Sequence, residues 1–107
     1  MTDITITKEN IDARHGRYVA RVAGVEGEGE LTFTRRSETV ISADHTGVPE
    51  ALSGRGVAKA LYAFLLDDAR ESGFRIIPVC PFVRKLYERQ RRDPASDVER
   101  LFTTARS

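Results

Sequence analysis

The chain has 107 residues, of which 40% are hydrophobic and 31% charged, and its formal net charge is +1. This length and composition predict one globular domain with a modest core and exclude an intrinsically disordered chain. The small net charge predicts no bulk attraction to nucleic acid or acidic membranes, and one cysteine with two histidines is too few for a convincing zinc site.

Residues 1–7 contain neither a basic start nor a long apolar run, so we expect no signal peptide. No stretch of the chain approaches the ~20 apolar residues of a membrane span. A lone cysteine cannot form an internal disulfide, and a reducing cytoplasm is the simplest compartment for such a chain.

Three segments predict strands, at residues 18–22, 30–35 and 39–44. The middle segment alternates, with Leu31 and Phe33 on one face. A turn rich in Gly and Glu at residues 24–29 separates the first two segments, and residues 36–37 separate the last two. We expect an antiparallel meander that is buried on one face.

The clearest local prediction is a helix over residues 57–72. Its apolar residues follow one stripe at helical spacing: Val57, Leu61, Phe64, Leu65 and Ala69. Gly73 is placed to end this helix in a left-handed conformation. A strand over residues 74–79 follows, and Pro78, which lacks an N–H, should lie at an edge or at an interruption of the ladder.

A second, short helix is predicted over residues 82–91, and the sequence Arg92-Asp93-Pro94 ends it. Residues 95–107 are interpreted as a C-terminal tail, with a short helix near residues 98–102 or loose order. We therefore divide the chain into one domain at residues 1–94 and a tail at 95–107.

A glycine-rich turn directly before the long helix is the most informative feature of the chain. Gly54 and Gly56 flank Arg55, after a strand and before the helix. Glycines let the backbone approach a ligand closely, and the first N–H groups of a helix are unpaired and lie at the positive end of its dipole. The pattern predicts a site for a phosphate or pyrophosphate.

The sequence does not match two common phosphate-binding loops, because its glycines are differently spaced. The dinucleotide fingerprint needs a third glycine where Lys59 stands, and the nucleoside-triphosphate loop needs four residues between its glycines. Residues 53–58 instead resemble the acetyl-coenzyme A loop of the GNAT superfamily of N-acetyltransferases, written Gln/Arg-x-x-Gly-x-Gly/Ala. Gly56 and Ala58 match that loop, whereas Ser53 stands where Gln or Arg is usual.

A second segment, residues 75–88, resembles the next GNAT strand and its following helix. Cys80 stands where an Asn often ends the strand, and Tyr87 follows at the spacing of the tyrosine in many members. The cysteine at the strand end, together with residues 45–49 before the loop, resembles a short single-domain branch of the superfamily. The resemblance covers residues 17–92.

This resemblance implies an α/β (α+β) fold: a mixed, mainly antiparallel sheet, a long helix after the glycine loop, and a second short helix. It implies an N-acetyltransferase that moves an acetyl or short acyl group from acetyl-CoA, its cosubstrate, to an amine, with no metal. The implied cofactor-binding residues are Ser53, Gly54, Arg55, Gly56, Val57, Ala58, Lys59 and Arg84.

Three residues are candidate catalytic groups. Tyr87 either packs behind the cofactor or protonates the departing thiolate, for which a neutral phenol is a competent donor. Cys80 is a packing residue, an acetyl-carrying nucleophile or a target of modification. We expect His45 to face Cys80 across the splayed strands, where it accepts the amine proton or activates the thiol. Direct transfer is the favoured mechanism, and Glu50 is a second candidate base.

Residues 17–44 show no helical pattern for the two helices that full-length members carry between their first strands. We therefore expect an open acceptor site that suits a protein or peptide lysine, or a polyamine. The alternative is a non-catalytic acyl-CoA-binding sensor or interaction module. A cationic helix face is interpreted as solvated, or as a contact for the 3′-phosphate of coenzyme A or for an acidic acceptor: Arg84, Lys85, Arg89, Arg91 and Arg92.

Nucleic acid is not an expected partner, because Tyr87 is the one aromatic residue interleaved with those cations. The sequence leaves both a monomer and a dimer open.

Overall fold

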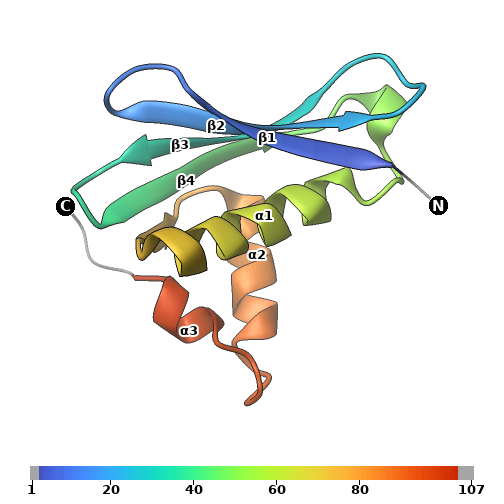
Figure 1. Ribbon diagram of the computed structural model, residues 1–107. Coiled ribbons are helices and arrows are strands. Elements are labelled where there is room, and N and C mark those ends of the chain that lie inside the picture. Colours follow the sequence, from blue (N-terminus) through green and yellow to red (C-terminus); the bar gives the residue numbers. More distant parts are fainter. Residues whose placement is uncertain (1–2, 104–107) are drawn as a thin grey trace.

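The computed structural model describes residues 3–103 and shows one mixed sheet with helices on one side (Figure 1). The strands follow one another in chain order across the sheet: β1 (Ile4–Asn10), β2 (His15–Val22), β3 (Gly29–Arg35), β4 (Val40–Gly47) and β5 (Arg75–Pro78). β1 to β4 form an antiparallel meander, and β5 pairs parallel to β4. The predicted fold class and the predicted meander are confirmed, and β1 is an additional edge strand.

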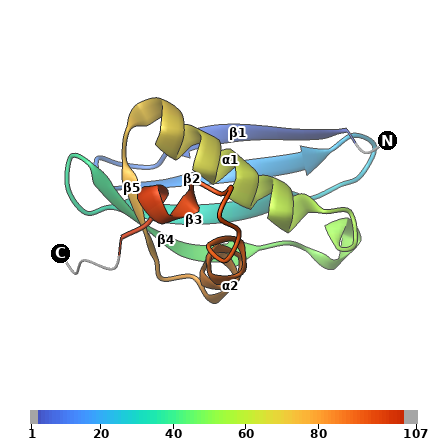
Figure 2. The same ribbon diagram turned by 90° about the horizontal axis from the view of Figure 1, so that it is seen from below.

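The helices cover a single face of the sheet (Figure 2). They are α1 (Val57–Ser72), α2 (Pro81–Gln90) and α3 (Val98–Leu101), and a 3₁₀ turn, η1 (Glu50–Leu52), precedes α1. The apolar sides of β2 to β5 pack against them, so the core lies between sheet and helices. Within the described residues 3–103, no helix lies over the opposite face of the sheet (Figure 1). None of the helices within residues 3–103 is long and apolar enough to cross a membrane.

α1 begins in close contact with the sheet. A Cβ added at Gly29 would lie 2.9 Å from Cγ1 of Val57 and 3.6 Å from Cδ1 of Leu61, so β3 tolerates α1 at this distance because residue 29 is glycine. Gly73 ends α1 with φ 79°, which confirms the predicted left-handed cap.

The far half of α1 is held to the sheet through Asp68. The hydroxyl of the buried Tyr18 donates to Asp68 Oδ2 at 2.7 Å, and Lys8 Nζ lies 2.8 Å from the same oxygen. Burial acts to raise the pKa of Asp68, but the hydrogen bonds from Lys8 and Tyr18 outweigh it and lower this pKa below its ordinary value. These contacts fix how α1 crosses β1 and β2.

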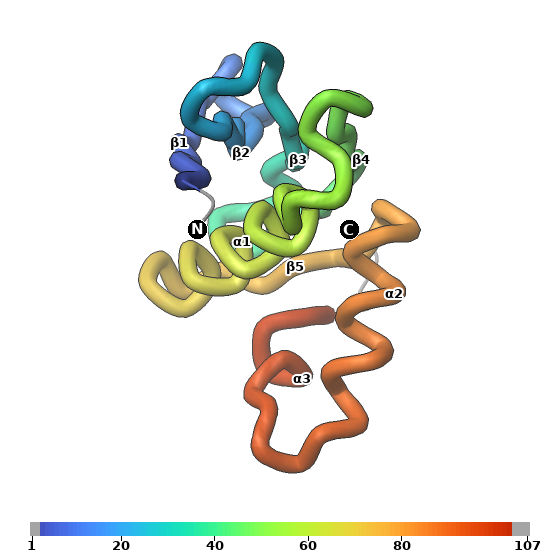
Figure 3. The backbone as a smooth tube through the Cα atoms, turned by 90° about the vertical axis from the view of Figure 1, so that its right-hand side faces the viewer, coloured from blue at the N-terminus to red at the C-terminus, as the bar shows by residue number. Residues whose placement is uncertain are grey.

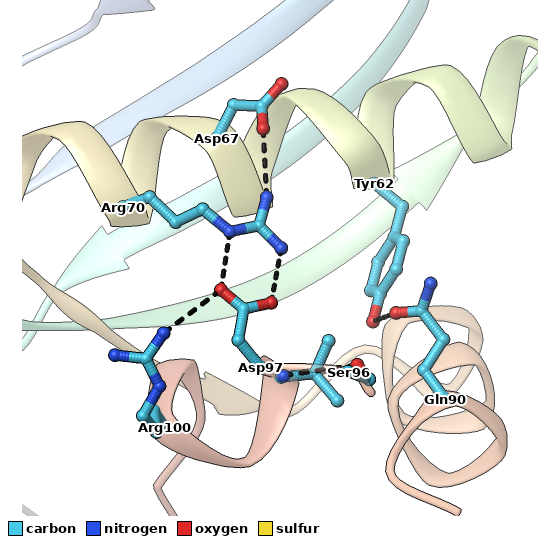
Figure 4. A network of polar contacts seen from close by, with 8 residues as sticks. Tyr62, Asp67, Arg70, Gln90, Ser96, Asp97 and Arg100 are labelled. Atoms are coloured by element: carbon cyan, nitrogen blue, oxygen red, sulfur yellow. Dashed lines mark hydrogen bonds and ion pairs between the residues drawn. The ribbon is translucent and has the colours of Figure 1, made fainter. Parts of the chain in front are cut away.

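The described part of the predicted tail packs into the same core as the domain. Val98, Leu101 and Phe102 are buried, and Phe102 forms a parallel bridge to Ile76 of β5. Arg70 of α1 donates to both carboxylate oxygens of Asp97 at the start of α3 (Figure 4). Residues 104–107 of the predicted tail lie outside the described part of the chain.

Candidate functional site

β4 and β5 part at the end of β5. Their ladder runs from Val40–Arg75 to Ala43–Pro78, after which β4 continues and the other chain turns into α2. Figure 3 shows this parting from the side, with β4 running on among the strands and β5 leading into α2. Pro78 therefore ends the ladder, as its missing N–H predicts. The Cys80 N–H donates to Ala43 O at 2.7 Å and closes the base of the opening.

A β-bulge lies in β4 at this same level. The register pairs Thr32 with His45 but Phe33 with Ala43, so Asp44 is the extra residue. Without the bulge, alternation from the inward-facing Ala43 would turn His45 inward as well. With it, Thr46 takes the inward position, and its Oγ1 lies 3.3 Å from Cys80 Sγ.

The structure thus does not place His45 opposite Cys80, and this expectation is wrong. His45 is exposed on the open face of the sheet, and its Nε2 would lie 3.2 Å from a Cβ at Gly47. Cys80 is 3% exposed, and Thr46 is its side-chain hydrogen-bond partner within residues 3–103. No histidine or carboxylate is hydrogen-bonded to the thiol in that part of the chain, so the site holds no preassembled base for it.

Tyr87 lies on the side of α2 that faces the C-terminal segment. Its ring stacks on Phe102 with centroids 4.2 Å apart, and the guanidinium of Arg91 lies 5.7 Å from the ring centroid. Among the described residues, the Tyr87 hydroxyl has no hydrogen-bond partner. The ring of Tyr87 therefore packs on Phe102, and no described residue occupies its hydroxyl.

The glycine loop presents a row of unpaired backbone donors. Gly54 and Gly56 have φ of 76° and 77°, in the left-handed region that favours glycine. No N–H group from Gly54 to Lys59 donates a hydrogen bond to any residue between 3 and 103. A Cβ at either glycine would meet no described atom within 4 Å, so open space lies beside the loop at these two positions.

Two side chains of the loop make hydrogen bonds within the protein. Ser53 Oγ donates to the carbonyl of Glu50, and Arg55 Nε donates to the carbonyl of Ala51, so both help to hold η1. Arg84 Nε donates to Pro78 O at 3.2 Å and supports the end of β5. Lys59, another cation predicted for the cofactor, lines a groove.

This groove lies between α1 and α2 and has a volume of about 280 Å³. It is lined by Lys59, Tyr62, Ala63, Leu66, Leu86, Arg89 and Gln90. The Tyr62 hydroxyl donates to Gln90 Oε1 at 2.8 Å and joins the two helices there (Figure 4). Burial raises the pKa of Tyr62, so its phenol stays neutral. Because Lys59 belongs both to the N–H row and to the groove, the two are continuous.

Sequence reasoning placed Arg89 in a cationic helix face, interpreted as solvated or as a contact for the 3′-phosphate of coenzyme A or an acidic acceptor, and did not single out Tyr62 or Gln90. The signal was present as helical spacing, since Lys59, Tyr62, Ala63 and Leu66 share one side of α1. The sequence did not show that α2 packs next to this side of α1. Within residues 3–103, no group of three or more His, Cys, Asp or Glu side chains is arranged to hold a metal ion.

Comparison with known proteins agrees with this geometry. Residues 17–98 match the family model described as GCN5-related N-acetyl-transferase. Protein NATD1 of Bos taurus is 30% identical over 74 residues, which is 69% of this chain and 66% of that protein. Protein NATD1 of Homo sapiens is 28% identical over 74 residues, with the same coverage, and that of Gallus gallus is 27% identical over 74 residues, 69% of this chain and 67% of that protein.

The match therefore spans slightly less than two thirds of the bovine and human relatives. The family model, by contrast, covers most of this chain, including the glycine loop, both helices of the groove and the end of β5. The chain belongs to the GCN5-related N-acetyltransferase family.

Proposed function

We propose that this protein is an acetyltransferase that moves an acetyl or short acyl group from acyl-CoA to an amine. The observation that carries the proposal is the unpaired N–H row from Gly54 to Lys59, continuous with the groove between α1 and α2. Acetyl-CoA is a long anionic ligand with a pyrophosphate near its middle, and a helix start with free N–H groups suits that pyrophosphate.

The groove fits the remaining anionic part of such a ligand. Its floor is apolar, with Ala63, Leu66 and Leu86, while Lys59 and Arg89 supply positive charge. A cation beside an adenosine 3′-phosphate forms a charge-assisted contact. These residues, and not Arg84, are the side chains that we assign to the nucleotide end.

The chemistry that acetyl-CoA supplies is an activated thioester: the amine nitrogen bonds to the carbonyl carbon, the C–S bond breaks, the amine loses a proton and the thiolate gains one. The chain's residues position and exchange protons. His45 on the open face accepts the amine proton, directly or through water. The free Tyr87 hydroxyl donates the proton to the thiolate. Holding both reactants at the parted strands is itself a large contribution to rate.

Direct transfer is favoured over an acetylated cysteine. Cys80 is buried against Thr46 and has no hydrogen-bonded base within the described chain. A thiol nucleophile reacts as its thiolate, and no described side chain is placed to take the proton from Cys80. Cys80 then serves as a small packing residue at the base of the opening.

A second candidate is a binding module that holds acyl-CoA and turns over little. The same missing base beside Cys80 favours it, and so does the packing of Tyr87 on Phe102. The two candidates share the cofactor site and differ in whether an amine is consumed.

Calorimetric titration with acetyl-CoA, followed by intact mass measurement, tests the proposal. We expect saturable binding, an unchanged mass, and coenzyme A release that continues when an amine is added. Absence of binding at high micromolar acetyl-CoA would remove the cofactor assignment and leave the glycine loop as a plain turn. Binding with no turnover across primary amines would support the binding module, and one added acetyl group that disappears in Cys80→Ala would make the thiol a covalent participant.

A further inference from the structure

We propose that Asp44 and Val79 form an acceptor subsite on the open face of the sheet, for a primary ammonium group carried on an unbranched methylene chain. The inference rests on the acetyl-transfer function proposed above and names the acceptor class that this site takes. Lysine side chains and polyamine ends share this chemistry.

The position of Asp44 follows from its hydrogen bonds, and that of Val79 from the end of β5. The last β4–β5 pair is Ala43 with Pro78, and both of these residues are buried on the helix side. Asp44 is the bulge residue after Ala43, and it lies on the open face because it accepts hydrogen bonds from Thr34 and Ser42, which pair there. Val79 follows Pro78 where the strands part; its N–H donates to Ile77 O, and its side chain is exposed. The hydrogen bond from Cys80 N–H to Ala43 O keeps the two chains adjacent at this level.

The carboxylate of Asp44 is oriented but not neutralised. Thr34 Oγ1 donates to one of its oxygens, and Ser42 Oγ donates to the other at 2.7 Å. Arg36 Nε donates to Ser42 Oγ at 3.0 Å and not to the carboxylate. Between residues 3 and 103, no lysine or arginine pairs with Asp44.

Other carboxylates on the same face have a cationic partner. Glu9, Glu28 and Glu30 all pair with Arg17 at 2.9 to 3.3 Å. A half-buried carboxylate with two hydroxyl donors and no cation is therefore a local exception. Such a group forms a charge-assisted hydrogen bond with an incoming ammonium ion.

Val79 supplies the apolar half of the subsite. It is 44% exposed, one of the large hydrophobic side chains that the described chain leaves in solvent. Ile77, two residues earlier, pairs with Ser42 in the ladder and is half-buried on the open face. An aliphatic chain that ends in an ammonium at Asp44 covers this surface, which removes apolar area from water.

The arrangement also lets the two reactants approach from different sides. The N–H row and the groove belong to α1 and α2, which cover one face of the sheet (Figure 1), whereas Asp44 shares the uncovered face with Thr34 and Ser42. The bulge places His45 on that face directly after Asp44. The ammonium held by Asp44 passes one proton to His45 or water, and its nitrogen lone pair then attacks the thioester carbonyl.

Steady-state kinetics with saturating acetyl-CoA test the subsite, using Nα-acetyl-lysine amide, spermidine and hexylamine as acceptors. Asp44→Asn keeps the size and one carbonyl oxygen of the side chain but removes its charge. We expect KM for all three amines to rise at least about 10-fold, as loss of a charged hydrogen bond predicts, with KM for acetyl-CoA unchanged. The matched control is Glu9→Gln, which removes one charge from the same face and leaves Arg17 two other partners.

Val79→Ser is a second variant that an exposed position should tolerate. We expect it to raise KM for hexylamine several-fold and to leave KM for methylamine unchanged, because methylamine has no chain to cover Val79. The ratio of kcat/KM for Nα-acetyl-lysine amide to that for spermidine in the wild type shows which source of the ammonium the site prefers. Equal KM values in Asp44→Asn and Glu9→Gln would overturn the subsite while leaving acetyl transfer intact.

A binding measurement separates this inference from the proposed function. Spermidine added to the protein without acetyl-CoA should shift the backbone amide resonances of Asp44, His45 and Val79, and Asp44→Asn should abolish the shifts. If acetyl-CoA fails to bind but these shifts persist, the proposed function fails and the ammonium site stands. If the shifts are absent up to about 10 mM spermidine, the ammonium site is wrong whatever acetyl-CoA does.

Discussion

At the scale of single residues, substitutions of glycine can distinguish the cost of backbone strain from a loss of acetyl-CoA binding at the loop. Gly56 and Gly24 share φ values of 77° and 79°, and a Cβ at either position would meet no atom within 4 Å. An L-residue in this region costs about 1–2 kcal/mol, so Gly56→Ala and Gly24→Ala should lower the free energy of unfolding by similar amounts. Their shared backbone strain makes Gly24→Ala, in the turn between β2 and β3, the matched control for the loop.

We predict that Gly56→Ala raises the dissociation constant of acetyl-CoA at least about 10-fold, because its methyl group enters the space in front of the N–H row. Gly24→Ala should leave that constant unchanged. Calorimetry on the two variants checks this, with urea unfolding to confirm that their stabilities match. Equal acetyl-CoA affinities in the two variants would mean that the ligand phosphates do not lie at this loop.

Tyr87→Phe tests the proton donor, because it removes the hydroxyl and retains the ring stack on Phe102. If the hydroxyl protonates the leaving thiolate, kcat should fall roughly 100-fold with little change in the affinity for acetyl-CoA. Tyr62→Phe is the comparison, since it also removes one phenol but breaks the hydrogen bond to Gln90. A Tyr87→Phe enzyme with wild-type kcat would leave Tyr87 with packing alone.

At the scale of elements, α3 is held to α1 by an ion pair that carries a pH dependence. The Arg70 guanidinium lowers the pKa of Asp97 from 3.8 to about 2. Since the folded-state pKa is the lower one, the carboxylate stabilises the fold fully above about pH 4 and loses this contribution as the pH falls toward about 2. Asp97→Asn should therefore be less stable than wild type near pH 6 and approach it near pH 2.

Urea midpoints measured across that range check this prediction. Glu99→Gln, an exposed substitution on the same short helix, is the control. The difference in urea midpoint between this variant and wild type should not shrink as the pH falls. A gap between Asp97→Asn and wild type that stays constant from about pH 6 to pH 2 would show that the carboxylate charge does not stabilise the junction of α1 and α3.

The elements also show which parts of the molecule the sequence could predict. The range and cap of α1 follow from local information, a helical stripe and Gly73, and both are confirmed. The side on which His45 lies depends on one extra residue at Asp44, which reverses every later side chain of β4. No local pattern marked that bulge, and so the expected pairing of His45 with Cys80 was wrong.

The groove between α1 and α2 could not be predicted from the sequence, for a different reason. Lys59 and Arg89 come from different helices, and their meeting depends on how α1 and α2 pack. β1, in contrast, was detectable: Ile4 and Ile6 alternate with threonines, and both pack against the core. Its short apolar pattern at an edge carried less signal than the strands of the meander.

At the scale of the whole molecule, one small core supports the proposed cofactor site on one side and an open sheet on the other. The proposed site is formed by α1 and α2, and β5 connects the two helices along the chain (Figure 3). A ligand that contacts the loop and both helices bridges elements that otherwise meet through a few contacts such as Tyr62 with Gln90. Binding of such a ligand should therefore raise the free energy of unfolding of the whole domain.

A ligand at 100 times its dissociation constant adds about 2.7 kcal/mol to the free energy of unfolding. For a domain of this size we predict that acetyl-CoA then raises Tm by roughly 10 °C or more, measured by calorimetry. Acetyl-pantetheine, which keeps the thioester but lacks the phosphates, should raise Tm far less at the same concentration, because it cannot use the N–H row of the loop or the cations Lys59 and Arg89. If the two ligands raised Tm equally, the phosphates would contribute no binding energy, and the ligand would be held mainly at the parted strands. The assignment of the glycine loop as the phosphate site would then be wrong.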